Sequence, residues 1–437
     1  MDTLRSFADA VLPKPENPRK PKFWNKPDSL SELFELRKLT APQTNEVPPT
    51  DLFEYYWAYQ AEGTKFAHII SWAITLLFRR PANVPRHLLF LWWTIWTLTV
   101  IVAVAILVYV GRHDSLSPSM LAANGVVGLL ASIALSVISA FVINYVGDAA
   151  RYLDPRPPNI AMRQRIRKEG IELLQRLHEC RDYDRVIVVG HSLGSVIAYD
   201  LVRHLWPKYN TAHGRTAGVP QPVNERLDAI GESLVQSPTP ERFDAFREAQ
   251  LALWKEERHI GNPWLITDVI TLGSPLAHAA LLLADTPKDL RERQDERELP
   301  TCPPVVDEGS YSYGLAYEEG STTYRYRALH HAAMFACTRW TNLYFPAPLG
   351  LLGDLVGGRV ADVFGPGVRD VAVTSAEAGG LLQHTPVIHT HYWSPRTIGT
   401  RSAAPVSALE ALRSALALDS RAWLREVATS GDHAAAI

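Results

Sequence analysis

Three separate segments of this 437-residue chain carry residue types that could perform nucleophilic catalysis. They are GHSLG with Ser192, GDLVGG with Asp354, and LLQHTPVIHTHYW with His384, His389 and His391. A serine hydroxyl becomes a nucleophile when a histidine removes its proton and an acid orients that histidine. The chain order serine, acid, histidine therefore indicates acyl transfer through a covalent intermediate.

The sequence around Ser192 predicts a strand, a sharp turn and a helix. RVIVV (185–189) is a continuously apolar, β-branched run typical of a buried parallel strand, and SVIAYDLVRHLW (195–206) is amphipathic with helical spacing. Glycines on both sides of the serine allow backbone to approach closely. This is the context of the nucleophile elbow of the α/β-hydrolase fold, in which the backbone N–H of the next residue, Leu193, is one oxyanion donor. The alternative is a serine in an ordinary structural turn.

The acid and the base are less sharply defined by the residues alone. Asp354 follows the strand-like RWTNLYFP in a glycine-rich loop, where the acid is expected, but Asp362 and Asp370 compete as ordinary surface carboxylates. The three histidines could form a metal cluster, yet no carboxylate or cysteine at ligand spacing accompanies them. One histidine as the catalytic base is the better account, and neither a metal nor an organic cofactor is expected.

Composition excludes several other classes of protein. The formal net charge is −2 and the pI is near 6.7, so charge gives no argument for nucleic-acid binding. Cys180, Cys302 and Cys337 are an odd, widely spaced set, which argues against a disulfide framework.

Two uncharged apolar runs suggest a membrane segment. Leu88 to Gly111 and Leu121 to Gly147 are each long enough to cross a bilayer, and they predict a two-helix transmembrane hairpin. Arginines flank the hairpin on both outer sides, whereas the connecting loop offers only Arg112. The positive-inside rule then places both soluble parts in the cytoplasm. The shorter apolar segment 65–81 is predicted to be an amphipathic helix, at the membrane surface or packed against the protein, rather than a third span.

The expected fold is therefore α/β, with an α/β-hydrolase sheet that is mostly parallel, helices on both faces, and an interrupting transmembrane hairpin. The expected division is residues 1–86 as the N-terminal part of the hydrolase domain, 87–147 as the hairpin, and 148–437 as the main catalytic domain.

These motifs resemble those of a family of bacterial membrane-associated α/β-hydrolases of the lipase and esterase type. The matching stretches are DLFEYYWA, GHSLGS, TLGSPL, RWTNLYFP with LLGDLVGG, and HTHYW. The resemblance selects His389 over His391 through an H-x-x-Y-W pattern, and Asp354 through D-x-V-G-G. It also implies a first strand ending in HGxGEQ, directly before a stretch like MDTLRSFADAV. This sequence begins at that Met, so two alternatives are open: either the start codon is placed too late, or the product lacks that strand and its part of the oxyanion hole.

The resulting expectation is an integral protein of the bacterial inner membrane that acts as a serine hydrolase on carboxylic esters, including lipid esters. Ser192 attacks, His389 (or His391) is the base, Asp354 orients it, and Leu193 supplies an oxyanion donor. The expected partners are the lipid bilayer and a small-molecule or lipid ester, without nucleic acid. Two alternatives remain open: a catalytically impaired membrane scaffold on a hydrolase fold, and an acyltransferase that uses the same triad.

Overall fold

The computed structural model describes residues 2–61, 157–213, 219–375, 385–394 and 406–419. Short gaps fall at 16, 18, 31–36, 46, 320, 348–352 and 355, and Tyr152 and scattered positions between 80 and 104 are also described.

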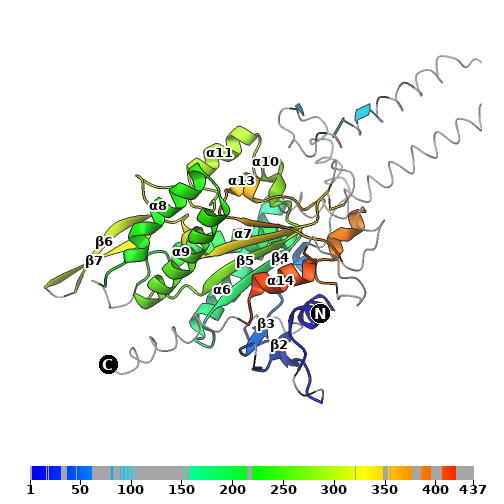
Figure 1. Cartoon of the computed structure of the whole chain (residues 1–437), viewed down its shortest axis with the longest axis horizontal. Helices are drawn as coiled ribbons and strands as arrows, with labels where there is room; N and C mark the ends of the chain where they lie inside the picture. The colour runs from blue at the N-terminus through cyan, green and yellow to red at the C-terminus, as the bar shows by residue number, and fades with distance from the viewer. Residues whose placement is uncertain are drawn as a thin grey trace, which may run out of the picture.

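A four-stranded parallel sheet lies at the centre of the described chain (Figure 1). Its strands, in spatial order, are β4 (Val186–His191), β5 (Ile266–Leu272), β8 (Arg339–Tyr344) and β9 (Arg369–Ala372). Every residue of β5 is buried, because this strand is paired on both edges and covered on both faces. His191 pairs with Leu272, and Leu272 with Leu343. The segments that follow β4, β5 and β8 therefore leave the sheet at one edge.

Helices of varied length connect and cover the strands. The α-helices are α1 (Asp2–Val11), α6 (Pro157–Glu179), α7 (Leu193–Leu205), α8 (Pro222–Gln236), α9 (Pro240–His259), α10 (Ala279–Leu282), α11 (Pro287–Asp295), α12 (Met334–Cys337), α13 (Ala361–Phe364) and α14 (Ala408–Leu416). The short 3-10 helices are η1 (Ala58–Ala61), η5 (Trp206–Lys208), η6 (Pro275–His278) and η9 (Pro386–Thr390).

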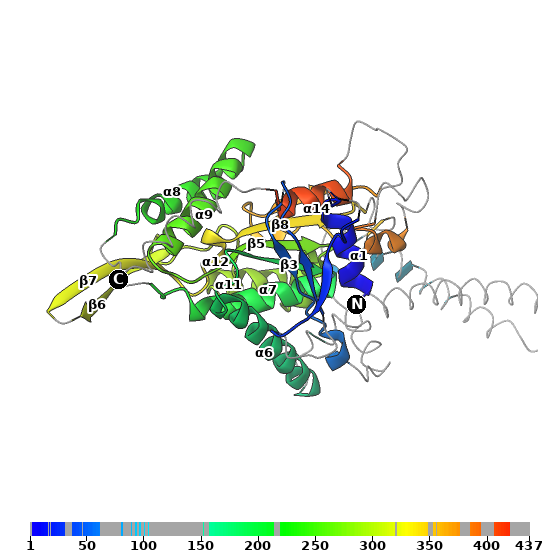
Figure 2. The ribbon, with the colours of Figure 1, turned by 90° about the horizontal axis from the view of Figure 1, so that it is seen from below.

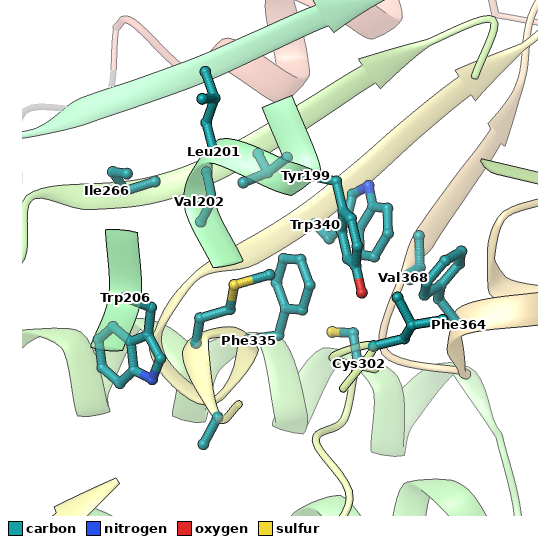
Figure 3. Close-up of a cluster of buried hydrophobic side chains, with 14 of the residues drawn as sticks. Tyr199, Leu201, Val202, Trp206, Ile266, Cys302, Phe335, Trp340, Phe364 and Val368 are labelled. Carbon is teal, nitrogen blue, oxygen red and sulfur yellow. The ribbon is translucent and has the colours of Figure 1, made fainter. Parts of the chain in front are cut away.

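The sheet has a hydrophobic cluster on each face. Val269 packs with α6, α7 and α9 on one face, and its neighbour Ile270 packs with α1 and α14 on the other, as expected from the alternation of side chains along a strand. Figure 2 shows α6 and α7 on the opposite side of the sheet from α14. In the first cluster (Figure 3), Trp340 of β8 stacks on Phe335 at a centroid distance of 4.7 Å and on Tyr199 of α7 at 5.5 Å. This packing fixes the helix that follows Ser192 against the sheet.

The predicted fold class is wrong, because the described residues form a mixed set of sheets. In addition to the parallel sheet, β1 (Trp24–Pro27), β2 (Arg37–Ala41) and β3 (Thr50–Leu52) form an antiparallel sheet, and β6 (Ser312–Glu319) and β7 (Thr322–Leu329) form an antiparallel ribbon. The connections 28–36, 42–49 and 320–321 are shorter than the crossover of about a dozen residues that parallel neighbours require.

The predicted membrane hairpin is also unsupported. Within the described part of the chain, no helix is both long enough and apolar enough to span a bilayer. The longest described helix, α6, has 23 residues but carries charged side chains throughout, among them Arg163, Arg167 and Glu172. Except for isolated positions, the two predicted spans lie outside the described residues. Residues 65–79 and the predicted domain boundaries at 86 and 147 also lie outside them. The prediction of an integral membrane protein is corrected accordingly.

Candidate active site

Ser192 occupies the turn between β4 and α7 in a strained conformation. Its φ is 53° and its ψ is −130°, a region that residues with a side chain rarely adopt. The Ser192 N–H donates to the Leu272 carbonyl at 2.9 Å, which attaches the turn to the end of β5. Ser192 makes no side-chain capping hydrogen bond to α7, although it stands at the N-cap position. The predicted strand, turn and helix are confirmed, and the strain identifies the turn as a candidate functional position.

The two glycines of GHSLG differ in function. A Cβ on Gly190 would lie 2.5 Å from the Gly194 carbonyl oxygen and 2.6 Å from the Cα of Ser195, so β4 and α7 can meet only at a glycine. A Cβ on Gly194 would meet nothing within 4 Å. The expectation of close backbone approach is therefore right for Gly190 and wrong for Gly194.

Ser195 fixes the turn from within the helix. Its N–H and its hydroxyl both donate to the Ser192 carbonyl, at 2.9 and 2.6 Å, and its Oγ lies 2.7 Å from Oγ of Ser274. Ser274 belongs to the Gly-Ser-Pro turn predicted after β5, and its side chain accepts the Leu276 N–H at the start of η6. The turns after β4 and β5 therefore support each other.

Leu193 is the first residue of α7. The N–H groups of the first helical turn have no intrahelical acceptor, and they point along the positive end of the helix dipole. The Leu193 N–H is therefore suited to a developing negative charge beside Ser192, and its role as an oxyanion donor stays a prediction.

Asp354 and His389 form a buried pair. Nδ1 of His389 lies 2.9 Å from both Oδ1 and Oδ2 of Asp354, and the two residues are 2% and 0% exposed. The backbone N–H groups of Val356 and Gly357 also donate to Oδ1, each at 2.9 Å. Burial by itself raises the pKa of Asp354, but the hydrogen bonds and charge of His389 and the Gly357 N–H hold it below its ordinary value. Because an ionised carboxylate only accepts, we assign the proton to Nδ1, which leaves Nε2 as the basic nitrogen.

This pair is held against the ends of β4 and β5, where Ser192 lies. A Cβ on Gly273, the residue after Leu272, would lie 2.8 Å from Cε1 of His389, so the imidazole rests directly on this glycine. The His191 ring lies 4.8 Å from that of His389, and its Nε2 is 2.8 Å from the His389 carbonyl oxygen. Burial, and next the neighbouring His389, hold the pKa of His191 at about 4, so at neutral pH its Nε2–H donates to this carbonyl. The residue before Ser192 therefore attaches the segment that carries His389 to the turn between β4 and α7.

The competing candidates lie elsewhere. Asp362 is largely exposed and pairs with Arg359 on the surface. Asp370 of β9 accepts the N–H groups of Val360 and Ala361 at the start of α13, which is a structural function. His391 is partly exposed and bonds only locally, for example through Nδ1 to the Val387 carbonyl at 3.1 Å.

His384 lies outside the described residues. In the described part of the chain, no group of three or more His, Cys, Asp or Glu side chains is placed to hold a metal ion.

A cleft of about 390 Å³ lies between α8 and the β6–β7 ribbon, lined by residues such as Gln221, Leu315 and Arg325. It contains none of the predicted catalytic residues.

Sequence reasoning missed two contributors to the site, Tyr392 and His191. The Tyr392 hydroxyl donates to Oδ2 of Asp354 at 2.7 Å. Tyr392 belongs to the HTHYW motif and His191 to the GHSLG motif, but nothing in the sequence alone shows that they contact the acid and the base.

Comparison with protein-family models, with curated proteins and with solved structures returned no match.

Proposed function

We propose that this protein is a serine hydrolase that cleaves carboxylic esters through an acyl-enzyme. The observation that carries the proposal is the buried Asp354–His389 pair, which packs on Gly273. Leu272, the residue before Gly273, accepts the backbone N–H of the strained Ser192, so the pair and the serine lie at the same end of β5. Strain on a non-glycine residue and a buried, oriented histidine are both costly to maintain, and both occur at the same edge of the sheet.

In the proposed mechanism, Ser192 Oγ attacks the ester carbonyl while Nε2 of His389 accepts its proton. Asp354 keeps the imidazole in the productive tautomer and stabilises the imidazolium that forms. The Leu193 N–H stabilises the oxyanion of the tetrahedral intermediate. His389 then returns the proton to the leaving alkoxide, and a water molecule activated by the same histidine releases the acid from Ser192.

Reaction of the purified 437-residue chain with a fluorophosphonate probe tests this proposal. The probe forms a covalent bond with an activated serine, so Ser192→Ala should lower labelling by at least about 1000-fold. Ser237→Ala is the matched control, because this exposed serine lies at the C-terminal end of α8, and its loss should leave labelling unchanged. A chain that reacts with the probe should also hydrolyse p-nitrophenyl acyl esters.

An unlabelled, folded chain would refute the proposal and favour a non-catalytic scaffold. A labelled chain that transfers its acyl group to an added alcohol and releases no acid to water would instead be an acyltransferase.

A further inference from the structure

The Tyr392 hydroxyl makes two defined hydrogen bonds in the core of the site. It accepts the Phe345 N–H at 3.2 Å and donates to Oδ2 of Asp354 at 2.7 Å, and the side chain is fully buried. A phenol has one proton to donate. Because Phe345 is the donor in the first bond, that proton is committed to Asp354.

Tyr392 and His389 hold the same carboxylate from one short segment of chain. They are three residues apart, around the end of η9, and both donate to Asp354. Oδ1 of Asp354 accepts hydrogen bonds from the backbone N–H groups of Val356 and Gly357. Among the bonds the structure gives, Oδ2 accepts from the Tyr392 hydroxyl and from Nδ1 of His389, which lies equally close to Oδ1. Without the phenol, the carboxylate could rotate about its Cβ–Cγ bond, and Oδ2 would depend on the histidine alone.

We propose that Tyr392 is a positioning residue of the site, which fixes the rotation of the Asp354 carboxylate and shares its negative charge with His389. This inference rests on the proposed serine hydrolase function. The structure assigns Tyr392 no direct contact with Ser192; it acts through the acid.

Among the residues that the structure describes, few titratable groups face the pair. Asp354 comes from the loop after β8, Tyr392 from the segment that carries His389, and His191 from the end of β4, while β5 contributes the uncharged Gly273. Burial, and next the charge of Asp354, raise the pKa of Tyr392 well above its ordinary value. The phenol is therefore a hydrogen-bond donor throughout the pH range of a histidine-dependent reaction.

Tyr392→Phe tests this role, with Tyr152→Phe as the matched control. Tyr152 is also fully buried and also donates to a buried aspartate, Asp200, at 2.8 Å. Asp200 lies in the second half of α7, away from Ser192. Both variants lose the same chemical group, so a general effect of losing a buried hydroxyl appears in both.

The rate of fluorophosphonate labelling is measured as a function of pH for each variant. For Tyr392→Phe, we expect the plateau rate to fall by about 10- to 100-fold, because the imidazole is less well oriented. We also expect the midpoint of the pH profile to rise by about 0.5 to 1 pH unit, because a carboxylate that has lost a donor holds the imidazolium proton more tightly. Tyr152→Phe should label within about twofold of the wild type and keep its midpoint. A merely structural role would lower the rate without moving the midpoint.

A second substitution keeps the test decisive if Tyr392→Phe unfolds. Site-specific 3-fluorotyrosine at position 392 retains the ring and the hydrogen bond but is a stronger donor, so the midpoint should move down. Midpoints at the wild-type value in both variants would overturn the inference, even if the wild type labels. An unlabelled wild type would instead refute the proposed function, so the two failures are distinguishable.

Discussion

The close contact at Gly190 gives a sharp prediction for a single methyl group. In Gly190→Ala the new Cβ would lie 2.5 Å from the Gly194 oxygen and 2.6 to 2.7 Å from backbone atoms of Ser195, whereas ordinary contacts begin at 3.4 Å. All three neighbours are backbone, so no flexible side chain can move aside. The first turn of α7 must therefore shift from β4 by about 0.9 Å to restore an ordinary contact distance. Such overpacking costs about 1–3 kcal/mol of unfolding free energy.

The same shift moves Ser192 relative to His389, because Ser192 is attached to α7 and His389 rests on Gly273. Misplacement of a reacting group by about 1 Å can lower a rate by about 100-fold. Urea denaturation and the fluorophosphonate labelling rate measure the two effects. Gly194→Ala is the control for stability: its Cβ meets nothing within 4 Å, so its unfolding free energy should stay equal or rise. Wild-type stability and labelling in Gly190→Ala would refute the reasoning.

Two further predictions concern the acid and the response to pH. Asp354→Asn should lower the labelling rate by about 10,000-fold, because the wrong imidazole tautomer is then favoured, whereas Asp362→Asn should leave the rate unchanged; equal losses would contradict the assignment. Burial holds the pKa of His178 at about 4, below the ordinary 6.5, so the unfolded chain is protonated first as the pH falls. The contribution of the neutral His178 to the free energy of unfolding is therefore fully present above about pH 6.5 and is lost as the pH falls toward 4. His178→Phe keeps a ring against Tyr209 but cannot be protonated. Between pH 7 and pH 5, its free energy of unfolding in urea denaturation should fall by about 2 kcal/mol less than that of the wild type. An equal fall in both proteins would exclude His178 as the cause.

The sequence was most informative where local pattern and chemistry coincide. The β-branched run before Ser192 and the amphipathic run after it predict a strand and a helix, and the structure begins β4 at Val186 and α7 at Leu193. The position of Asp354 after a strand favours it over Asp362 and Asp370, whereas only the family resemblance favours His389 over His391. The structure brings Asp354 and His389 together, and their catalytic roles stay predictions. Tyr392 could not be assigned in advance, because its partner lies 38 residues away along the chain.

The fold was harder to predict because short strands carry little periodic signal. β1, for example, has four residues that are all exposed, so no buried face marks it as a strand. The β6–β7 ribbon has a better periodic signal, because apolar or aromatic residues alternate along both strands, as at Tyr313 and Leu315 and at Tyr324 and Tyr326. Leu315 lies opposite Tyr326 in the ribbon. The membrane prediction rests on the length and hydropathy of two segments, whereas the long helices that the structure describes are charged rather than apolar.

The hydrogen bond from the Ser192 N–H to the Leu272 carbonyl also has a kinetic consequence. It joins residues 80 positions apart, and His389 lies further still along the chain. The candidate site of Ser192 and His389 therefore cannot form through contacts between sequence neighbours alone. Contacts between residues so distant in sequence form late, because the loops between them must first be closed. During refolding, helix formation in α6 and α9 should therefore precede fluorophosphonate labelling of the proposed nucleophile Ser192, because that labelling requires both the joining of β4 and β5 and the docking of His389.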